Sequence, residues 1–451
     1  MAAGDSSRTS DNPHNVSVME RPRPRSRQIR WWICGLLFAS TVINYLDRQT
    51  LALLAPNLKT LFRWNNTDYA NLVIGFRIAY TLGQVFCGRL LDRVGTRKGA
   101  SITVAFYSAV SMLTPLANGF LSFLGFRFLL GLGESANWPA ATKAVSEWFP
   151  AKERALATAF FDSGSSLGGA VAPFLIFWID ARWGWKPAFI VPGALGIVWL
   201  LLWRRFYHSP EHHPSISTEE LAMIRAESLT SGTRATNQPI RLRELLGLRE
   251  TWGAIAARML TDPVWFFITD WFPIYLVAKG FELRSSFLAV WVPFLAADAG
   301  SYAGGIISGW LIRRGWSLLP ARKAIVVAGG MGTLLLIPTI FVNNLFLITA
   351  LFSIATFSYA AFSVMANVLP SDLYQPEAVA TVSGLSGAAA GIGTILGFKA
   401  VGYLSDARRA TGTHAFDPIM VACGLIPCIG AVAVLWLIRT QRSPSGALKS
   451  A

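Results

Sequence analysis

Twelve long apolar runs divide this 451-residue sequence, and they limit its fold more than any other feature. A helix needs about 20 mostly apolar residues to cross the core of a bilayer. The runs are 31–56, 68–90, 100–117, 121–143, 155–179, 187–206, 252–278, 285–311, 324–342, 345–369, 379–403 and 418–438. Only 14% of the residues are charged, against about 25% in soluble proteins. The sequence therefore predicts an all-α membrane protein with twelve transmembrane helices.

One long break separates the first six runs from the last six, which predicts two six-helix halves. It contains Ser217-x-x-Glu220, the spacing of a capping box, so a short helix should begin there. Residues 146–169 align without gaps on residues 371–394, as expected for pseudo-symmetric halves that rock around a central site. Chance similarity of two small-residue helices is the alternative. The expected divisions are a basic tail (1–30), an N-terminal half (31–206), a linker (207–251), a C-terminal half (252–438) and a second tail (439–451).

The positions of the basic residues predict an orientation. The net charge of +15 would suit a nucleic-acid partner. With the N-terminus inside, however, 27 of the 40 Lys and Arg residues lie in inside segments and only eight in outside loops. This bias follows the positive-inside rule and predicts that both termini and the linker are cytoplasmic, with no nucleic-acid patch. The other five lie within runs: Arg48, Arg77, Arg127, Arg258 and Lys399.

Charges inside a bilayer are costly, so each predicts either a functional site or an ion pair between helices. The first group is Asp47, Arg48, Arg127 and Glu134, and the second is Arg258, Asp270, Asp298 and Lys399. Arg127 and Glu134 are seven residues apart, which places them on one helix face about 10 Å apart. Counting from the outer ends puts Asp47 and Arg127 at similar depth, with Glu134 nearer the midplane.

Two acids and two arginines at similar depth can exchange partners. An entering anion can take the arginines by bidentate hydrogen bonds. The acids released from those pairs can then accept protons. This arrangement predicts symport of an anion with protons, although an Arg–Asp pair that only joins helices stays open as the alternative.

Further polar residues are candidates for binding a substrate. Arg77, Tyr80 and Gln84 form a polar stripe on an otherwise apolar helix. In the tenth run, "FSVMANVLPSD" offers Asn367 for sugar hydroxyls, although such residues also pack helices.

The segment "GRLLDRVGTRKG", residues 88–99, lies between the second and third runs. Gly88 permits close approach of helices, and Asp92 and Arg93 can pair across the turn or with a helix end. In this position the segment resembles the signature of the major facilitator superfamily. The resemblance implies that these three residues close the cytoplasmic side, so we assign them to gating. The second-half copy has Arg313 where the acid would be.

A closer resemblance covers nearly the whole chain after about residue 30. The segments "INYLDRQTLALLAPNLK", "GLGESANWPA", "FYHSPEHHPSISTEEL" and "WVPFLAADAGS" are similar to the anion:cation symporter family, particularly its bacterial hexuronate and sugar-acid (galactonate, glucarate) transporters. The family implies proton-coupled uptake of sugar-acid monoanions across a bacterial inner membrane, by a monomer without a cofactor.

The resemblance also implies roles for single residues. Its proton-carrying acids match Asp47 and Glu134. Its substrate-binding positions match Arg48, Arg127, Tyr45, Tyr80 and Arg258. One departure is "FFDSG", where the family often has F-N-S-G; Asp162 there can alter substrate choice or add a protonation site.

The other classes of function to weigh are a passive uniporter or exchanger, an enzyme and an ATP-driven transporter. A passive uniporter, or an exchanger of aromatic or dicarboxylic acids, would need the same charges only for selectivity. An enzyme is not expected, because no apolar run contains His and no nucleophile motif is present. ATP-driven transport is not expected either, because the sequence has no G-x-x-x-x-G-K-[ST] phosphate loop.

Overall fold

The computed structural model describes residues 28–230, 241–281, 287–408, 414 and 416–438, and within these ranges the chain is helical and contains no strand. The side chain of Asp270, one of the sequence candidates, lies outside the described part. Nine helical segments of the described part are long and apolar enough to cross a membrane. The predicted all-α membrane fold is confirmed, and the three remaining runs correspond to α4 with α5, to α11 and to α12.

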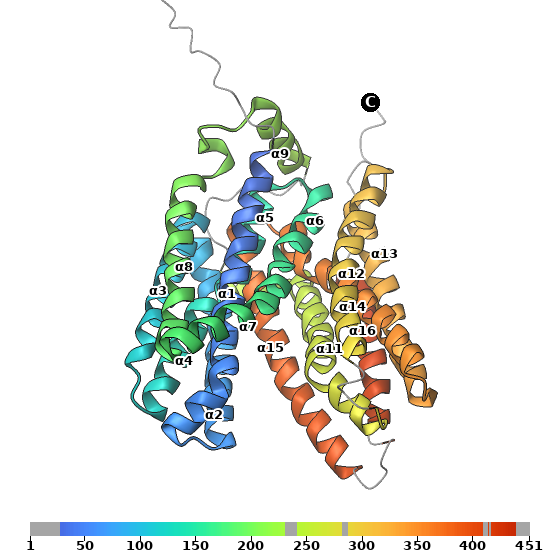
Figure 1. The fold of residues 1–451 in the computed structure, drawn as a ribbon. Coiled ribbons are helices and arrows are strands. Elements are labelled where there is room, and N and C mark those ends of the chain that lie inside the picture. Colours follow the sequence, from blue (N-terminus) through green and yellow to red (C-terminus); the bar gives the residue numbers. More distant parts are fainter. Residues whose placement is uncertain (1–27, 231–240, 282–286, 409–413, 415, 439–451) are drawn as a thin grey trace, which may run out of the picture.

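The helices form two bundles that stand side by side (Figure 1). The first contains α1 (Ile29–Phe62), α2 (Asn66–Val94), α3 (Thr96–Leu113) with η1 (Thr114–Leu116), α4 (Phe120–Glu134), α5 (Asn137–Trp148), α6 (Ala151–Asp162), α7 (Gly164–Trp183) and α8 (Trp185–Phe206). The second contains α11 (Arg249–Ala278), α12 (Phe287–Arg313), α13 (Leu318–Thr333) with η3 (Leu334–Phe341), α14 (Leu345–Leu373), α15 (Pro376–Ala407) and α16 (Asp417–Leu437).

Short helices connect the bundles at one end of the molecule. They are η2 (Pro210–His212), α9 (Thr218–Thr230) and α10 (Leu242–Gly247). Ser217 accepts a hydrogen bond from the backbone N–H of Glu220 at 3.1 Å, as predicted for a cap. The Glu220 carboxylate accepts from Arg30 Nη1 at 2.9 Å instead of completing a capping box. This contact ties α9 to the beginning of α1.

Two predicted spans are broken, which corrects the sequence analysis. The run 121–143 divides into α4 and α5 at Ser135 and Ala136. Pro139 explains this break, because it cannot donate to the Ser135 carbonyl four residues earlier and its ring crowds that carbonyl. The run 155–179 divides at Ser163, whose hydroxyl donates to the Phe160 carbonyl at 2.8 Å and competes with the helix ladder.

The two bundles approach most closely where α2 crosses α15. A Cβ atom added to Gly88 would lie 2.3 Å from the Ala380 carbonyl oxygen, so only glycine fits. Gly95 then ends α2 at φ 83°, a left-handed conformation that glycine adopts without strain. The glycines of the 88–99 segment thus permit the close helix approach and the tight turn that the sequence predicted.

Candidate functional site

An ion pair between Arg48 and Glu134 lies inside the first bundle. Arg48 donates to Glu134 Oε2 from Nη2 at 3.1 Å and from Nε at 3.4 Å. Its Nη2 also donates to Asn44 Oδ1, one turn earlier on α1, at 3.1 Å. The Glu134 side chain has no exposed surface, whereas 28% of the Arg48 side chain is exposed. The cation of this pair therefore remains accessible while its acid is enclosed.

Three aromatic rings surround the Arg48 guanidinium. Its carbon lies 5.0 Å from the ring centre of Tyr45, 5.3 Å from Phe76 and 4.8 Å from Tyr80. Each such contact is worth about 0.5–2 kcal/mol. The rings fix the plane of the guanidinium and help keep its charge inside the bundle. We call Arg48 and these three residues the arginine cage.

Asp47 and Arg127 complete the group that the sequence predicted. Asp47 is fully buried, and the Ser111 hydroxyl lies 2.9 Å from its Oδ1. Arg127 is 4% exposed and interacts electrostatically with both Asp47 and Glu134. The structure thus brings the four charges together from α1 and α4, as their depths predicted.

Hydrogen bonding in this group is incomplete. Asp47 Oδ2, Arg127 Nε and Glu134 Oε1 are buried without a hydrogen-bond partner among the described residues. Leaving a buried polar group unpaired costs about 1–3 kcal/mol. A bound anion, water or an added proton would satisfy these atoms, so the group is a candidate for binding a ligand or a proton.

A second cluster lies at the boundary between the bundles. Arg258 donates to Asp262 Oδ2 from Nη2 at 2.9 Å and from Nε at 3.2 Å. A Cβ atom on Gly387 would meet Gln84 Oε1 at 1.9 Å and Arg258 Nη1 at 3.1 Å. Gln84 and Arg258, both predicted to bind substrate, therefore meet at Gly387, in a cluster separate from the arginine cage.

Further candidates from the sequence are Arg77, Asn367 and Lys399. The Arg77 guanidinium lies over Phe266 at 5.1 Å and Phe398 at 5.6 Å, so it spans the two bundles. Asn367 is buried on α14 at 7% exposure, and Lys399 is exposed on α15.

Asn44, Phe76 and Ser111 were not predicted from the sequence. A polar or aromatic residue in a helix does not by itself indicate a functional site.

Asp92 joins the two bundles at the end where α9 lies. It accepts from Lys143 Nζ at 2.9 Å in the first bundle. It also accepts from the backbone N–H of Thr381 at 2.7 Å and from its hydroxyl at 2.6 Å in the second. Arg93 is exposed on the surface. The partner of Asp92 is thus Lys143, which the sequence analysis counted only as a loop charge.

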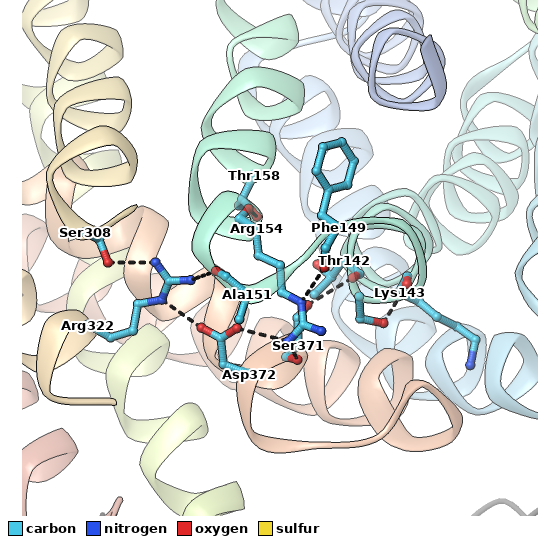
Figure 2. Close-up of polar contacts among 11 residues, drawn as sticks. Thr142, Lys143, Phe149, Ala151, Arg154, Thr158, Ser308, Arg322, Ser371 and Asp372 are labelled. Carbon is cyan, nitrogen blue, oxygen red and sulfur yellow. Dashed lines mark hydrogen bonds and ion pairs between the residues drawn. The ribbon is translucent and has the colours of Figure 1, made fainter. Parts of the chain in front are cut away.

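A second polar network joins the bundles, and no sequence motif predicted it (Figure 2). Asp372 on α14 accepts from Arg322 Nε at 2.8 Å and from Arg154 Nη1 at 3.3 Å. Arg322 also donates to Ser308 Oγ and to the Ala151 carbonyl, both at 2.7 Å. The Arg322 and Asp372 side chains have no exposed surface. This group, the Asp372 network, fastens α6 of the first bundle to α13 and α14 of the second.

Arg322→Ala is expected to lower the stability of the folded protein markedly. The change leaves Asp372 buried with one partner, and removing one member of a buried ion pair costs about 3–5 kcal/mol. Thermal unfolding in detergent, followed by tryptophan fluorescence, measures the effect. Arg314→Ala is the matched control, because the Arg314 side chain is exposed and its guanidinium lies over the Trp310 ring at 4.3 Å. Equal unfolding temperatures for the two variants would contradict this account of the network.

Similarity to known proteins identifies the family to which the chain belongs. The sequence profile of the Major Facilitator Superfamily matches residues 37–398. The chain therefore belongs to this superfamily, and it is a multi-pass membrane transporter and not an enzyme. Solved structures of the superfamily have the same fold. They include a proton:xylose symporter, XylE (TM-score 0.69, 14% identity, covering 90% of this chain and 94% of that one), and FucP in an outward conformation (TM-score 0.64, 15% identity, 91% and 98%).

Relatives with higher identity are sugar-acid transporters. The hexuronate transporter of Escherichia coli K12 is 31% identical over 92% of this chain and 95% of its own length. The galacturonate transporter of Dickeya chrysanthemi is 34% identical over 67% and 88%. The D-galactonate transporter of Escherichia coli O6:H1 is 30% identical over 91% and 95%. The resemblance to bacterial sugar-acid transporters is therefore confirmed.

Proposed function

We propose that this protein is a proton-coupled symporter that imports a sugar acid, such as a hexuronate or an aldonate, by alternating access. The observation that carries the proposal is the ion pair of a partly exposed Arg48 with a fully enclosed Glu134, beside a further buried arginine and acid. Relatives named for hexuronate, galacturonate and galactonate support a sugar acid as the anion.

The roles of the four charges follow from their exposure and pairing. Arg48 is the accessible cation, so a carboxylate binds it first and displaces Glu134 from it. Arg127 provides the second guanidinium, and its Nε has no hydrogen-bond partner in the part of the chain that the structure describes. Two guanidinium groups can hold one carboxylate by charge-assisted hydrogen bonds. We assign substrate binding to Arg48 and Arg127, with Tyr45 and Tyr80 lining the place where the substrate lies.

Proton coupling follows from the loss of these pairs. Once a substrate carboxylate holds the arginines, Glu134 and Asp47 are enclosed carboxylates without a counter-ion, and an isolated buried charge is unfavourable. Each can be neutralised by a proton. Release of the substrate restores the Arg48–Glu134 pair and expels the proton. Binding of anion and proton is therefore mutually favourable, which is the requirement for symport.

Alternating access requires the two bundles to move against each other. We propose that residues 31–206 and 252–438 are the moving halves and that 207–251 links them, with the tails at 1–30 and 439–451. The Asp92 contacts and the Asp372 network then close one side and must separate when it opens. We place that side, both termini and the linker in the cytoplasm of a bacterium whose inner membrane holds the protein as a monomer.

Uptake by proteoliposomes tests whether a sugar acid is carried at all. Purified protein is reconstituted, and entry of labelled galacturonate, glucuronate and galactonate is compared with entry into empty vesicles. We expect saturable entry of at least one of the three. Saturable entry of only aromatic or dicarboxylic acids would contradict the sugar-acid assignment and support the alternative carboxylate exchanger or uniporter.

A further inference from the structure

Asp162 lies at the boundary between the two bundles. It is the last residue of α6, immediately before the break at Ser163. The Ser163 hydroxyl lies 2.8 Å from the Tyr302 hydroxyl on α12. One turn further along α7, Ser166 donates to Asp298 Oδ1 at 2.9 Å. These two contacts hold the break against α12, so Asp162 is placed beside Asp298 of the second bundle.

The charges around Asp162 are predominantly negative. The groups that act on it electrostatically are Asp298, Arg258 and Asp262. Arg258 gives two of its hydrogen bonds to Asp262, so its charge is largely balanced by that carboxylate. Within the described residues, neither Asp162 nor Asp298 has an ion-pair partner within 4 Å. Among the described residues, these two carboxylates at the boundary between the bundles therefore have no ion-paired cation of their own.

The side-chain oxygen of Gln84 independently indicates a ligand that donates hydrogen bonds. Gln84 is 3% exposed, and its Oε1 has no hydrogen-bond partner among the described residues although it lies beside Arg258 at Gly387. An amide oxygen and carboxylate oxygens only accept hydrogen bonds. A ligand part that satisfies them must donate, as sugar hydroxyls do. A second carboxylate, which only accepts, would leave them unpaired.

α7, which begins two residues after Asp162, leads from this acceptor group to the arginine cage, because a Cβ atom on Gly168 would lie 2.9 Å from the Tyr45 Cβ. Asp162 acts electrostatically on Tyr45 of the cage and also on Tyr359 of the second bundle. A ligand whose carboxylate is held by Arg48 and Arg127 would therefore direct its other end toward Asp162 and Asp298.

We propose that Asp162 and Asp298 restrict the substrate to sugar acids with a single carboxylate. They accept hydrogen bonds from the hydroxyl end of a hexuronate or aldonate and repel the second carboxylate of a dicarboxylic sugar acid such as galactarate. Like charges brought together across a site are an effective means of rejecting a competitor. The proposal rests on the proposed function. The names of the relatives do not decide the matter, because they include galactarate/D-glucarate transporters, one of which is 30% identical over 91% of this chain.

Competition for uptake tests the proposal. Labelled galacturonate enters proteoliposomes that contain the full chain, and unlabelled galactonate and galactarate compete with it. For the wild type we expect galactarate to inhibit about tenfold more weakly than galactonate, or more weakly still, from repulsion between charges in a partly buried site. Asp162→Asn should remove most of that difference, chiefly by strengthening inhibition by galactarate, because the repelling charge is gone.

The matched control is Asp180→Asn, an acid at the far end of α7 that accepts from Asn57 at 3.3 Å. This variant should keep the wild-type ratio. If Asp162→Asn does not fold, as judged by gel filtration, Asp298→Asn replaces it, because it removes the other carboxylate.

Equal inhibition by the two acids in the wild type would overturn the proposal. So would an unchanged ratio in the folded variant. If the wild type takes up no sugar acid with a single carboxylate, the proposed function fails, and the inference fails with it. Transport of galacturonate without selectivity against galactarate would overturn the inference alone.

Discussion

Arg127→Ala is expected to weaken galacturonate binding by at least about 100-fold, since charge-assisted hydrogen bonds contribute roughly 1.5–3 kcal/mol each. Arg127 is 4% exposed, and both Asp47 and Glu134 act on it electrostatically. Without it, a substrate carboxylate enters a space where two acids face a single guanidinium. Repulsion then adds to the loss of the hydrogen bonds. Isothermal titration of the purified protein measures the dissociation constant.

Two further variants make this result interpretable. Arg127→Lys keeps the charge but loses the planar pair of donors, so it should bind with intermediate affinity. Arg182→Ala, at the exposed end of α7, should bind like the wild type, because the Arg182 side chain is exposed and lies over the Trp178 ring at 5.2 Å, away from the four central charges. An unchanged affinity in Arg127→Ala would remove Arg127 from the binding site.

Glu134→Gln is expected to abolish accumulation of substrate driven by a proton gradient and to preserve exchange of substrate across the membrane. Glutamine has the size of glutamate and can still accept from Arg48, but it cannot take up a proton. Binding of the anion should persist or tighten, because Arg48 loses a charged competitor for its donors. Counterflow, in which external label exchanges with internal unlabelled galacturonate, measures the preserved step.

The control for this variant is Glu211→Gln, an exposed acid in η2 that should leave both accumulation and counterflow unchanged. Wild-type accumulation in Glu134→Gln would assign proton coupling elsewhere, with Asp47 as the next candidate. Loss of counterflow together with accumulation would mean that Glu134 is needed for binding or movement and not only for the proton.

The sequence predicted the central charges well because charge inside an apolar run is rare. Asp47, Arg48, Arg127 and Glu134 each stand out against their surroundings, and helix geometry placed them at similar depth. It did not predict the pairing. Which acid pairs with which arginine depends on the rotation of α1 relative to α4. Side-chain packing between the two helices sets that rotation, and the sequence of one helix alone does not predict it.

Basic residues at helix ends were harder to interpret. Lys143 and Arg322 counted as orienting loop charges, yet both are buried where the bundles meet, and each pairs with an acid of its own bundle, Asp92 or Asp372. A charge at the end of a span looks the same in the sequence whether solvent or another helix covers it. The break at Ser135, in contrast, was predictable from Pro139, since a proline disturbs the carbonyl four residues earlier.

Accumulation of labelled galacturonate against its own gradient tests the central claim most directly. Proteoliposomes are prepared with an acidic exterior, and the internal concentration is followed with and without a protonophore. We predict an internal concentration well above the external one, which falls to equality when the protonophore removes the proton gradient. Entry that stops at equal concentrations, with or without the protonophore, would contradict proton symport and identify the protein as a uniporter.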